Sequence, residues 1–205
     1  MAGEERYELP PERLGRWLER WAEAHGGVAE AICSGTVVRF VARDGAVVEC
    51  EPPFPPVEGD LLAHVGRERV VGVLLVRLGG HAAGVFRGAR LLDSKVGARP
   101  VHGRNRKGGS SSGRFARRRA GQARVALDAA ADVAVRVLRA PAEAGRLEAV
   151  VLGGDRGALT TVLSDPRLVV VRGLAVPRVL DVPDPRVRVL EATPDAFLAT
   201  VVRVG

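Results

Sequence analysis

The chain has 205 residues, of which 46% are hydrophobic, and a formal net charge of +7, which excludes a disordered chain and allows one large domain or two small ones. No apolar stretch approaches the ~20 residues that span a bilayer, and the first ten residues are polar and acidic, unlike a secretory signal. We therefore expect a cytoplasmic protein with no membrane partner.

The first predicted elements are a helix and a β-hairpin. Four apolar residues recur at the spacing of a helix with one buried face, namely Leu14, Trp17, Leu18 and Trp21. His25-Gly26-Gly27 predicts the end of this helix. Two β-branched runs, 36–41 and 46–50, are joined by Arg43-Asp44-Gly45, which favours a hairpin.

Cys33 and Cys50 lie in or near these apolar segments, with no Cys-x-x-Cys spacing and no nearby histidine pair. We expect two buried thiols in a reducing compartment. The proline-rich run 52–56 marks a boundary between an N-terminal helix-plus-hairpin module, residues 1–57, and a main domain, residues 58–205. The same run could equally be a rigid turn within one domain.

The main domain begins with a predicted antiparallel meander over residues 70–78, 82–86 and 88–92, with 96–101 as an extension. His81 lies on this meander without a second metal ligand nearby in the sequence, which favours a structural histidine. A long helix is predicted from about Ser112 or Arg114 to Arg139. Its apolar stripe consists mostly of small residues, which permit close packing on a sheet: Ala123, Ala126, Leu127, Ala130, Val133, Ala134, Val137 and Leu138.

The last third of the chain shows a βαβ pattern, which is typical of a parallel sheet. A strand is predicted at 147–152, a short helix at 158–163 and a second strand at 168–171. The turn Gly153-Gly154-Asp155-Arg156 between them is too short for a dinucleotide fingerprint. A turn at 181–186, a short helix capped by Thr193-Pro194-Asp195 and a strand at 201–204 follow.

A basic segment carries most of the functional information. Between Ser94 and Leu127 there is no Asp or Glu, but ten positive charges: Lys95, Arg99, Arg104, Arg106, Lys107, Arg114, Arg117, Arg118, Arg119 and Arg124. Because these ten exceed the net charge of +7, the rest of the chain sums to −3. Such a local patch favours phosphate binding, and the lack of bulky apolar residues favours nucleic acid over lipid. A solvated loop followed by a basic helix face is the alternative.

The arginines at the start of the predicted helix are unfavourable for helix stability, because the macrodipole there favours anions. A bound phosphate resolves this conflict, since backbone N–H groups, dipole and guanidinium groups then act on one anion. Residues 102–119 form a glycine- and serine-rich loop between two basic clusters. A P-loop is absent, since the lysine precedes the glycines, and a serine nucleophile would have only His102 as a nearby base.

Gly108-Gly109, followed by Gly113-Arg114-Phe115-Ala116-Arg117-Arg118-Arg119, resembles the Gly-Gly-Gln loop and helix start of eukaryotic and archaeal class I peptide-chain release factors. The segment is more similar to the Vms-like branch of Actinobacteria, predicted peptidyl-tRNA hydrolases whose Gly-Gly loop leads into Arg-Phe-Ala-Arg-Arg-Arg. The resemblance extends over most of the chain after Glu58.

This resemblance implies an α+β fold, a mixed sheet with flanking helices of the release-factor middle-domain type, related to ribonuclease H. It implies a factor that binds ribosomal RNA of the large subunit or the tRNA acceptor end, and whose loop cleaves the peptidyl-tRNA ester without metal or organic cofactor. The expected catalytic loop residues are Gly108, Gly109, Ser110, Ser111 and Ser112. The expected RNA-binding residues are Arg104, Arg106, Lys107, Arg114, Arg117, Arg118, Arg119 and Arg124.

The expected loop glutamine is absent, and the nearest one, Gln122, lies on the order of 12 Å along the predicted helix from Arg114. Two hypotheses follow. Either hydrolysis uses the loop backbone, which can stabilise developing negative charge, a serine and the tRNA itself, or the protein binds ribosome or tRNA without cleavage. A third, a ribonuclease H-like nuclease, needs a metal-binding carboxylate cluster, for which Asp155, Asp181 and Asp184 are available.

Overall fold

The computed structural model describes residues 5–77, 79–97 and 112–205, with the backbone alone over 112–119. The chain forms two compact units. The N-terminal unit contains Met1–Glu68 and Pro194–Gly205, and the central unit contains Arg69–Thr193. Whereas the sequence placed a boundary at residue 57, these units group residues 58–68 and the end of the chain with the N-terminal segment.

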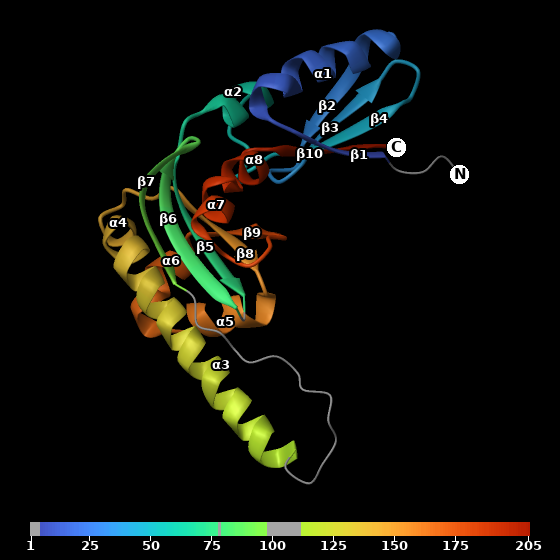
Figure 1. Cartoon of the computed structure of the whole chain (residues 1–205). Helices are drawn as coiled ribbons and strands as arrows, with labels where there is room; N and C mark the ends of the chain where they lie inside the picture. The colour runs from blue at the N-terminus through green and yellow to red at the C-terminus, as the bar shows by residue number, and fades with distance from the viewer. Residues whose placement is uncertain (1–4, 78, 98–111) are drawn as a thin grey trace. The chain divides into compact units, whose positions relative to one another are not determined.

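The N-terminal unit contains an antiparallel sheet with the order β1-β10-β4-β3-β2 (Figure 1). Its strands are β1 (Glu5–Leu9), β2 (Val28–Cys33), β3 (Val38–Ala42), β4 (Val47–Glu51) and β10 (Thr200–Val204). The accompanying helices are α1 (Pro11–Ala24), α2 (Leu61–Gly66) and α8 (Thr193–Phe197). Leu14 and Trp21 of α1 are buried in one cluster with Val48, Cys50 and Val202 of the sheet.

The local signals in this unit are confirmed. Pro11 occupies the first position of α1, and Gly26 and Gly27 end the helix with positive φ angles of 75° and 99°. The predicted hairpin is β3–β4, where the Ala46 amide donates to the Asp44 carboxylate at 3.0 Å. The proline-rich run lies inside this unit, because buried His64 accepts from the Glu58 amide and contacts the Pro53 carbonyl.

The central unit contains a mixed sheet with the order β7-β6-β5-β8-β9. Antiparallel β5 (Val70–Arg77), β6 (Gly80–Arg87) and β7 (Arg90–Gly97) are joined by β8 (Ala149–Gly154), parallel to β5, and β9 (Ala175–Leu180), parallel to β8. The helices are α3 (Ser112–Ala134), α4 (Ala140–Glu143), α5 (Arg156–Leu163), α6 (Val169–Gly173) and α7 (Val187–Glu191). A π-helical turn, Val135–Arg139, joins α3 to α4. This mixed sheet with flanking helices confirms the predicted fold class.

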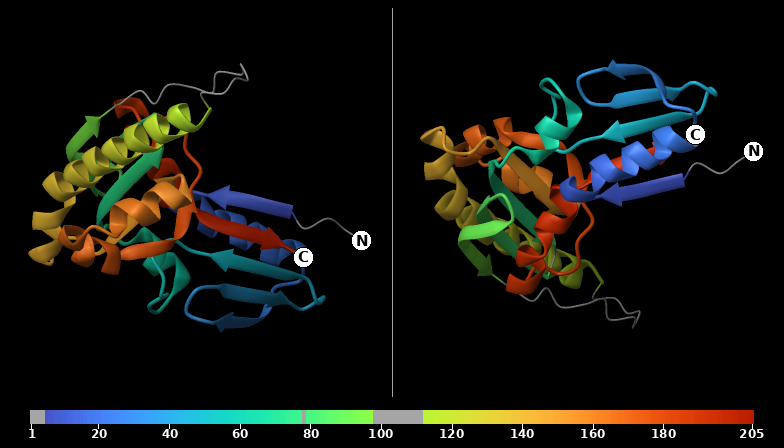
Figure 2. Two further views of the ribbon diagram at one scale, coloured as in Figure 1. Left: turned by 90° about the horizontal axis from the view of Figure 1, so that it is seen from below. Right: turned by 90° about the horizontal axis from the view of Figure 1, so that it is seen from above.

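The core of the central unit lies between the sheet and α3 and α5, which pack on one face of the sheet (Figure 2). The predicted small-residue stripe is buried there, with Ala130 and Ala134 almost fully enclosed. Small side chains let the α3 backbone approach β5 and β6 closely. Gly72 completes this fit, since a Cβ there would lie 3.1 Å from Leu138 Cδ2.

One predicted strand is wrong. Residues 168–171 form the end of a 3₁₀ turn, Pro166–Leu168, and the start of α6, and the strand of the βαβ pattern is β9. Leu168 and Val171 are buried whereas Val169 and Val170 are exposed, which is a helical period. A run of valines by itself does not distinguish these periods.

The expectation of two buried thiols is wrong for Cys33. Cys50 is buried and burial raises its pKa to about 12, but Cys33 is exposed on β2. β2 is an edge strand whose six residues are all exposed. Within the described ranges, no helix is long and apolar enough to cross a membrane.

This difference predicts the thiol chemistry of the native protein. Near pH 8 an aromatic disulfide reagent should modify one thiol quickly, because a pKa of about 12 reduces the thiolate fraction of Cys50 on the order of 1,000-fold relative to an ordinary thiol. Cys33→Ser should abolish the fast phase, and both thiols of wild type should react in denaturant. Two fast thiols in the native state would contradict the burial of Cys50.

Candidate nucleic-acid interface

Two elements of the central unit frame the basic segment. β7 ends at Gly97 and α3 begins at Ser112, and Lys95 is exposed on β7. The expected loop residues Gly108, Gly109, Ser110 and Ser111 lie outside the described residues, as do Arg104, Arg106 and Lys107. Ser112, the remaining expected loop residue, is the first residue of α3.

The end of β7 is shaped by His81. Its ring is buried, and a Cβ added at Gly97 would lie 2.2 Å from Nε2 of this ring. His81 and Gly97 are paired in the antiparallel β6–β7 register. Gly97 therefore leaves the space that the imidazole occupies at the point where the chain leaves the sheet.

The N-terminal half of α3 extends beyond the packed core (Figure 1). Ala126 is the first buried residue along the helix in the described side chains, whereas Gly121, Arg124 and Val125 are exposed. With the helical period of about 100° per residue, positions 114, 117 and 118 fall on the side away from the buried stripe, and exposed Arg124 lies at the edge of that stripe, nearly in line with buried Ala131. The expected RNA-binding positions on this side are therefore grouped by the helix backbone, and Arg119 is not among them.

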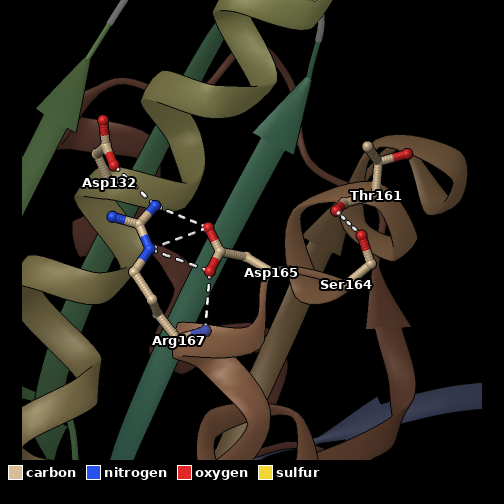
Figure 3. A network of polar contacts seen from close by, with 5 residues as sticks. All are labelled: Asp132, Thr161, Ser164, Asp165 and Arg167. Carbon is tan, nitrogen blue, oxygen red and sulfur yellow. Dashed lines mark hydrogen bonds and ion pairs between the residues drawn. The ribbon is translucent and has the colours of Figure 1, made fainter.

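Two acidic residues, Asp128 and Asp132, follow the basic positions on α3. Asp132 forms an ion pair with Arg167, whose Nη2 lies 2.9 Å from Oδ1. Arg167 also contacts Asp165 and holds the pKa of that carboxyl below its usual range (Figure 3). Asp128, exposed and four residues earlier, is the first acid after the basic segment.

The cluster of Arg167, Asp132 and Asp165 was not predicted from the sequence. Asp132 and Arg167 are 35 positions apart, and no local pattern connects them. The only available signal was Asp165-Pro166, which is typical of the start of a helical turn.

The turn Gly153–Arg156 has a packing role. Gly154 has a φ of 106°, and a Cβ there would lie 2.2 Å from the Val76 carbonyl oxygen. The Asp155 carboxylate accepts from the Ala158 amide at 2.7 Å and caps α5. Gly154 thus allows β8 to lie close to β5, and Asp155 caps the start of α5.

The nuclease hypothesis lacks a metal-binding cluster in the described part of the chain, where no three His, Cys, Asp or Glu side chains are placed to hold an ion. Asp155 caps a helix, as described above. Asp181 lies 4.0 Å from Arg77, and Asp184 is exposed. These three carboxylates do not form the site that the hypothesis needs.

Comparison with known proteins places the chain among translation factors. The sequence profile of the Actinobacteria/Chloroflexi VLRF1 release factor matches residues 69–203. No curated protein matches. The solved structures similar to this chain include an archaeal translation termination factor, aRF1, with 15% identity, a TM-score of 0.44 and coverage of 90% of this chain and 61% of the other. An archaeal protein is similar at 15% identity and a TM-score of 0.44, with 93% and 64% coverage. The chain therefore spans less than two thirds of the length of these structures.

The basic side of α3 predicts salt-dependent RNA binding. Arg117→Glu with Arg118→Glu should lower RNA affinity at least about tenfold and should reduce the slope of log affinity against log salt by about 2, because two phosphate contacts are lost. Fluorescence anisotropy with a tRNA acceptor-stem RNA measures both quantities.

The matched control is Arg13→Glu with Arg16→Glu, which makes the same charge change on the exposed side of α1. This variant should keep its affinity within about threefold, since it leaves every cation of the basic segment unchanged. Equal losses in both variants, or affinity independent of salt, would contradict a local phosphate-binding surface.

Proposed function

The chain belongs to the Actinobacteria/Chloroflexi VLRF1 release-factor family, and on this premise we propose that it is a peptidyl-tRNA hydrolase of stalled ribosomal or large-subunit complexes. The family match over residues 69–203 carries this proposal, because it includes the whole central unit, with the basic segment and α3. Family membership indicates a release-factor-like role in translation. Ester cleavage in peptidyl-tRNA and the large subunit as partner are our proposal.

The position of the Gly-Gly segment supports this function. Fourteen residues separate Gly97 from Ser112. Gly109 and Gly108 are three and four residues before Ser112, so an extended chain carries them at most about 14 Å from the start of α3. That reach, added to the part of α3 that extends beyond the core, allows the two glycines to enter a site on another molecule while the core of the central unit stays outside it.

In the proposed reaction, water attacks the ester carbonyl carbon. The tetrahedral intermediate then collapses as the bond to the terminal ribose oxygen of the tRNA breaks. That oxygen takes one proton of the water, the second proton goes to solvent, and the peptide is released as a carboxylate. Backbone N–H groups at Gly108 and Gly109 stabilise the negative charge that develops on the carbonyl oxygen, and Ser110, Ser111 and Ser112 position the water. RNA phosphates bind the flanking cations, which are Arg104, Arg106, Lys107, Arg114, Arg117, Arg118, Arg119 and Arg124.

A non-catalytic ribosome- or tRNA-binding protein is the second candidate, and the position of Gln122 favours it. Gln122 lies on α3 ten residues after Ser112, which corresponds to about 15 Å along the helix axis. It therefore cannot replace a glutamine at the tip of the preceding segment. A binder of this kind would use the same cations and would not need the glycines.

The first experiment measures release of labelled peptide from peptidyl-tRNA on isolated large ribosomal subunits. Gly108→Ala with Gly109→Ala should lower the rate at least about 100-fold, because Cβ atoms restrict the backbone that places the N–H groups. RNA affinity should stay within about twofold. Gly173→Ala is the matched control, since a Cβ at Gly173 meets nothing within 4 Å. A rate unaffected by the alanines would contradict the backbone mechanism.

The second experiment separates hydrolase from binder. Ser112→Gln restores a glutamine at the junction of the loop and α3. If wild type is a hydrolase that works through its backbone, this variant should change the release rate less than about tenfold. Binding without release in wild type, with release appearing only in Ser112→Gln, would instead establish the non-catalytic binder.

A further inference from the structure

We propose that Arg167 is a positioning residue that sets the direction in which the N-terminal half of α3 leaves the central unit, by bridging Asp132 on α3 to Asp165 beside the 3₁₀ turn. The role for hydrolysis rests on the proposed function. The mechanical part of the inference concerns the central unit alone.

The planar guanidinium group of Arg167 contacts two carboxylates, those of Asp165 and Asp132 (Figure 3). Arg167 Nε lies 3.0 Å and 3.1 Å from the two oxygens of Asp165, and Nη2 lies 2.7 Å from Asp165 Oδ2. The same Nη2 lies 2.9 Å from Asp132 Oδ1. Such multidentate geometry constrains both partners more than a single contact.

Hydrogen bonds and burial hold the 3₁₀ turn that carries Arg167 in place. The Asp165 carboxylate also accepts from the Arg167 amide at 2.8 Å, and the Leu168 amide donates to the Asp165 carbonyl at 2.9 Å. Pro166 restricts the backbone between them. Leu168 is completely buried in the core of the central unit. Arg167 is therefore held on a short turn that is anchored by its neighbours.

The apolar contacts of α3 lie on one side of the helix. Between positions 126 and 134 its buried side chains are alanines, Leu127 and Val133 pack partly buried beside them, and the first large buried ones are Val137 and Leu138. Asp132 lies on this stretch, on the exposed side of the helix. The bridge therefore adds a polar constraint on a side of α3 that the apolar packing does not hold.

A small change of angle at this anchor produces a large displacement at the helix start. Ala126 is fourteen positions after Ser112, about 20 Å of helix, so a tilt of about 10° moves Ser112 by roughly 3 Å. In catalysis a misplacement of about 1 Å can lower a rate on the order of 100-fold. The expected loop residues continue directly from this helix start.

The chain provides a matched ion pair for comparison. Arg139 and Glu143 are 2.7 Å apart, and both Arg139 and Arg167 have side chains that are 45% exposed. The Arg139–Glu143 pair joins the π-helical turn to α4 across four residues of continuous chain, so it does not link α3 to the 3₁₀ turn. Arg139→Ala is therefore the control for loss of a surface ion pair.

The experiment measures the direction of α3 by electron–electron double resonance between nitroxides at Gly121→Cys and Leu92→Cys, in a Cys33→Ser background. Both label positions are exposed in the central unit. Arg167→Ala and Asp132→Asn should widen the distance distribution at least about 1.5-fold. Asp132→Glu, which keeps the carboxylate, and Arg139→Ala should leave the width unchanged.

Kinetics on peptidyl-tRNA then test the consequence. Arg167→Ala should lower kcat at least about tenfold with KM changed less than about twofold, because substrate still binds but the loop is misplaced. Unchanged widths in Arg167→Ala and Asp132→Asn would overturn the inference, as would wider distributions in a variant with wild-type kcat. If wild type releases no peptide, the proposed function fails, and the distance widths alone decide the positioning role.

Discussion

The central unit depends on the close approach of α3 to the mixed sheet. Ala130 and Ala134 are almost fully buried against β-strand residues such as Ala83, and Gly72 leaves room for Leu138. Small side chains at these positions let the helix lie close to the sheet, with Leu127 and Val133 packed partly buried beside them. The contacts of Arg167 with Asp132 and Asp165 hold the same stretch of α3 from its exposed side.

The two halves of α3 consequently follow different physical requirements. The half that begins at Ala126 is determined by burial. The half that precedes it carries arginines near the helix start, where the dipole disfavours cations, and no acid occurs between Ser94 and Leu127. A composition that lowers helix stability without contributing to the core fits an anionic partner, and the proposed function supplies one in the phosphates of RNA.

The N-terminal unit shows a different constraint, since its sheet needs both ends of the chain. β10 lies between β1 and β4, and Val202 is paired with Cys50 on one side and Tyr7 on the other. The strand β1 has three charged residues among its five, Glu5, Arg6 and Glu8, and Tyr7 and Leu9 alone give too short an alternation to mark it as a strand. It becomes one because β10 offers it a complete set of pairing partners.

The sequence by itself determined the elements whose signals are local. The spacing of Leu14 and Trp21, the Asp44-Gly45 turn, the small-residue stripe of α3 and the family motif around Arg114 need only neighbouring residues to be interpreted. Tertiary structure alone decided that 168–171 is helical, that Cys33 is exposed on an edge strand, that the last strand completes the N-terminal sheet, and that Arg167 meets Asp132. Each of these depends on which face another element covers, and periodicity and turn chemistry carry no information on contacts between segments distant in sequence.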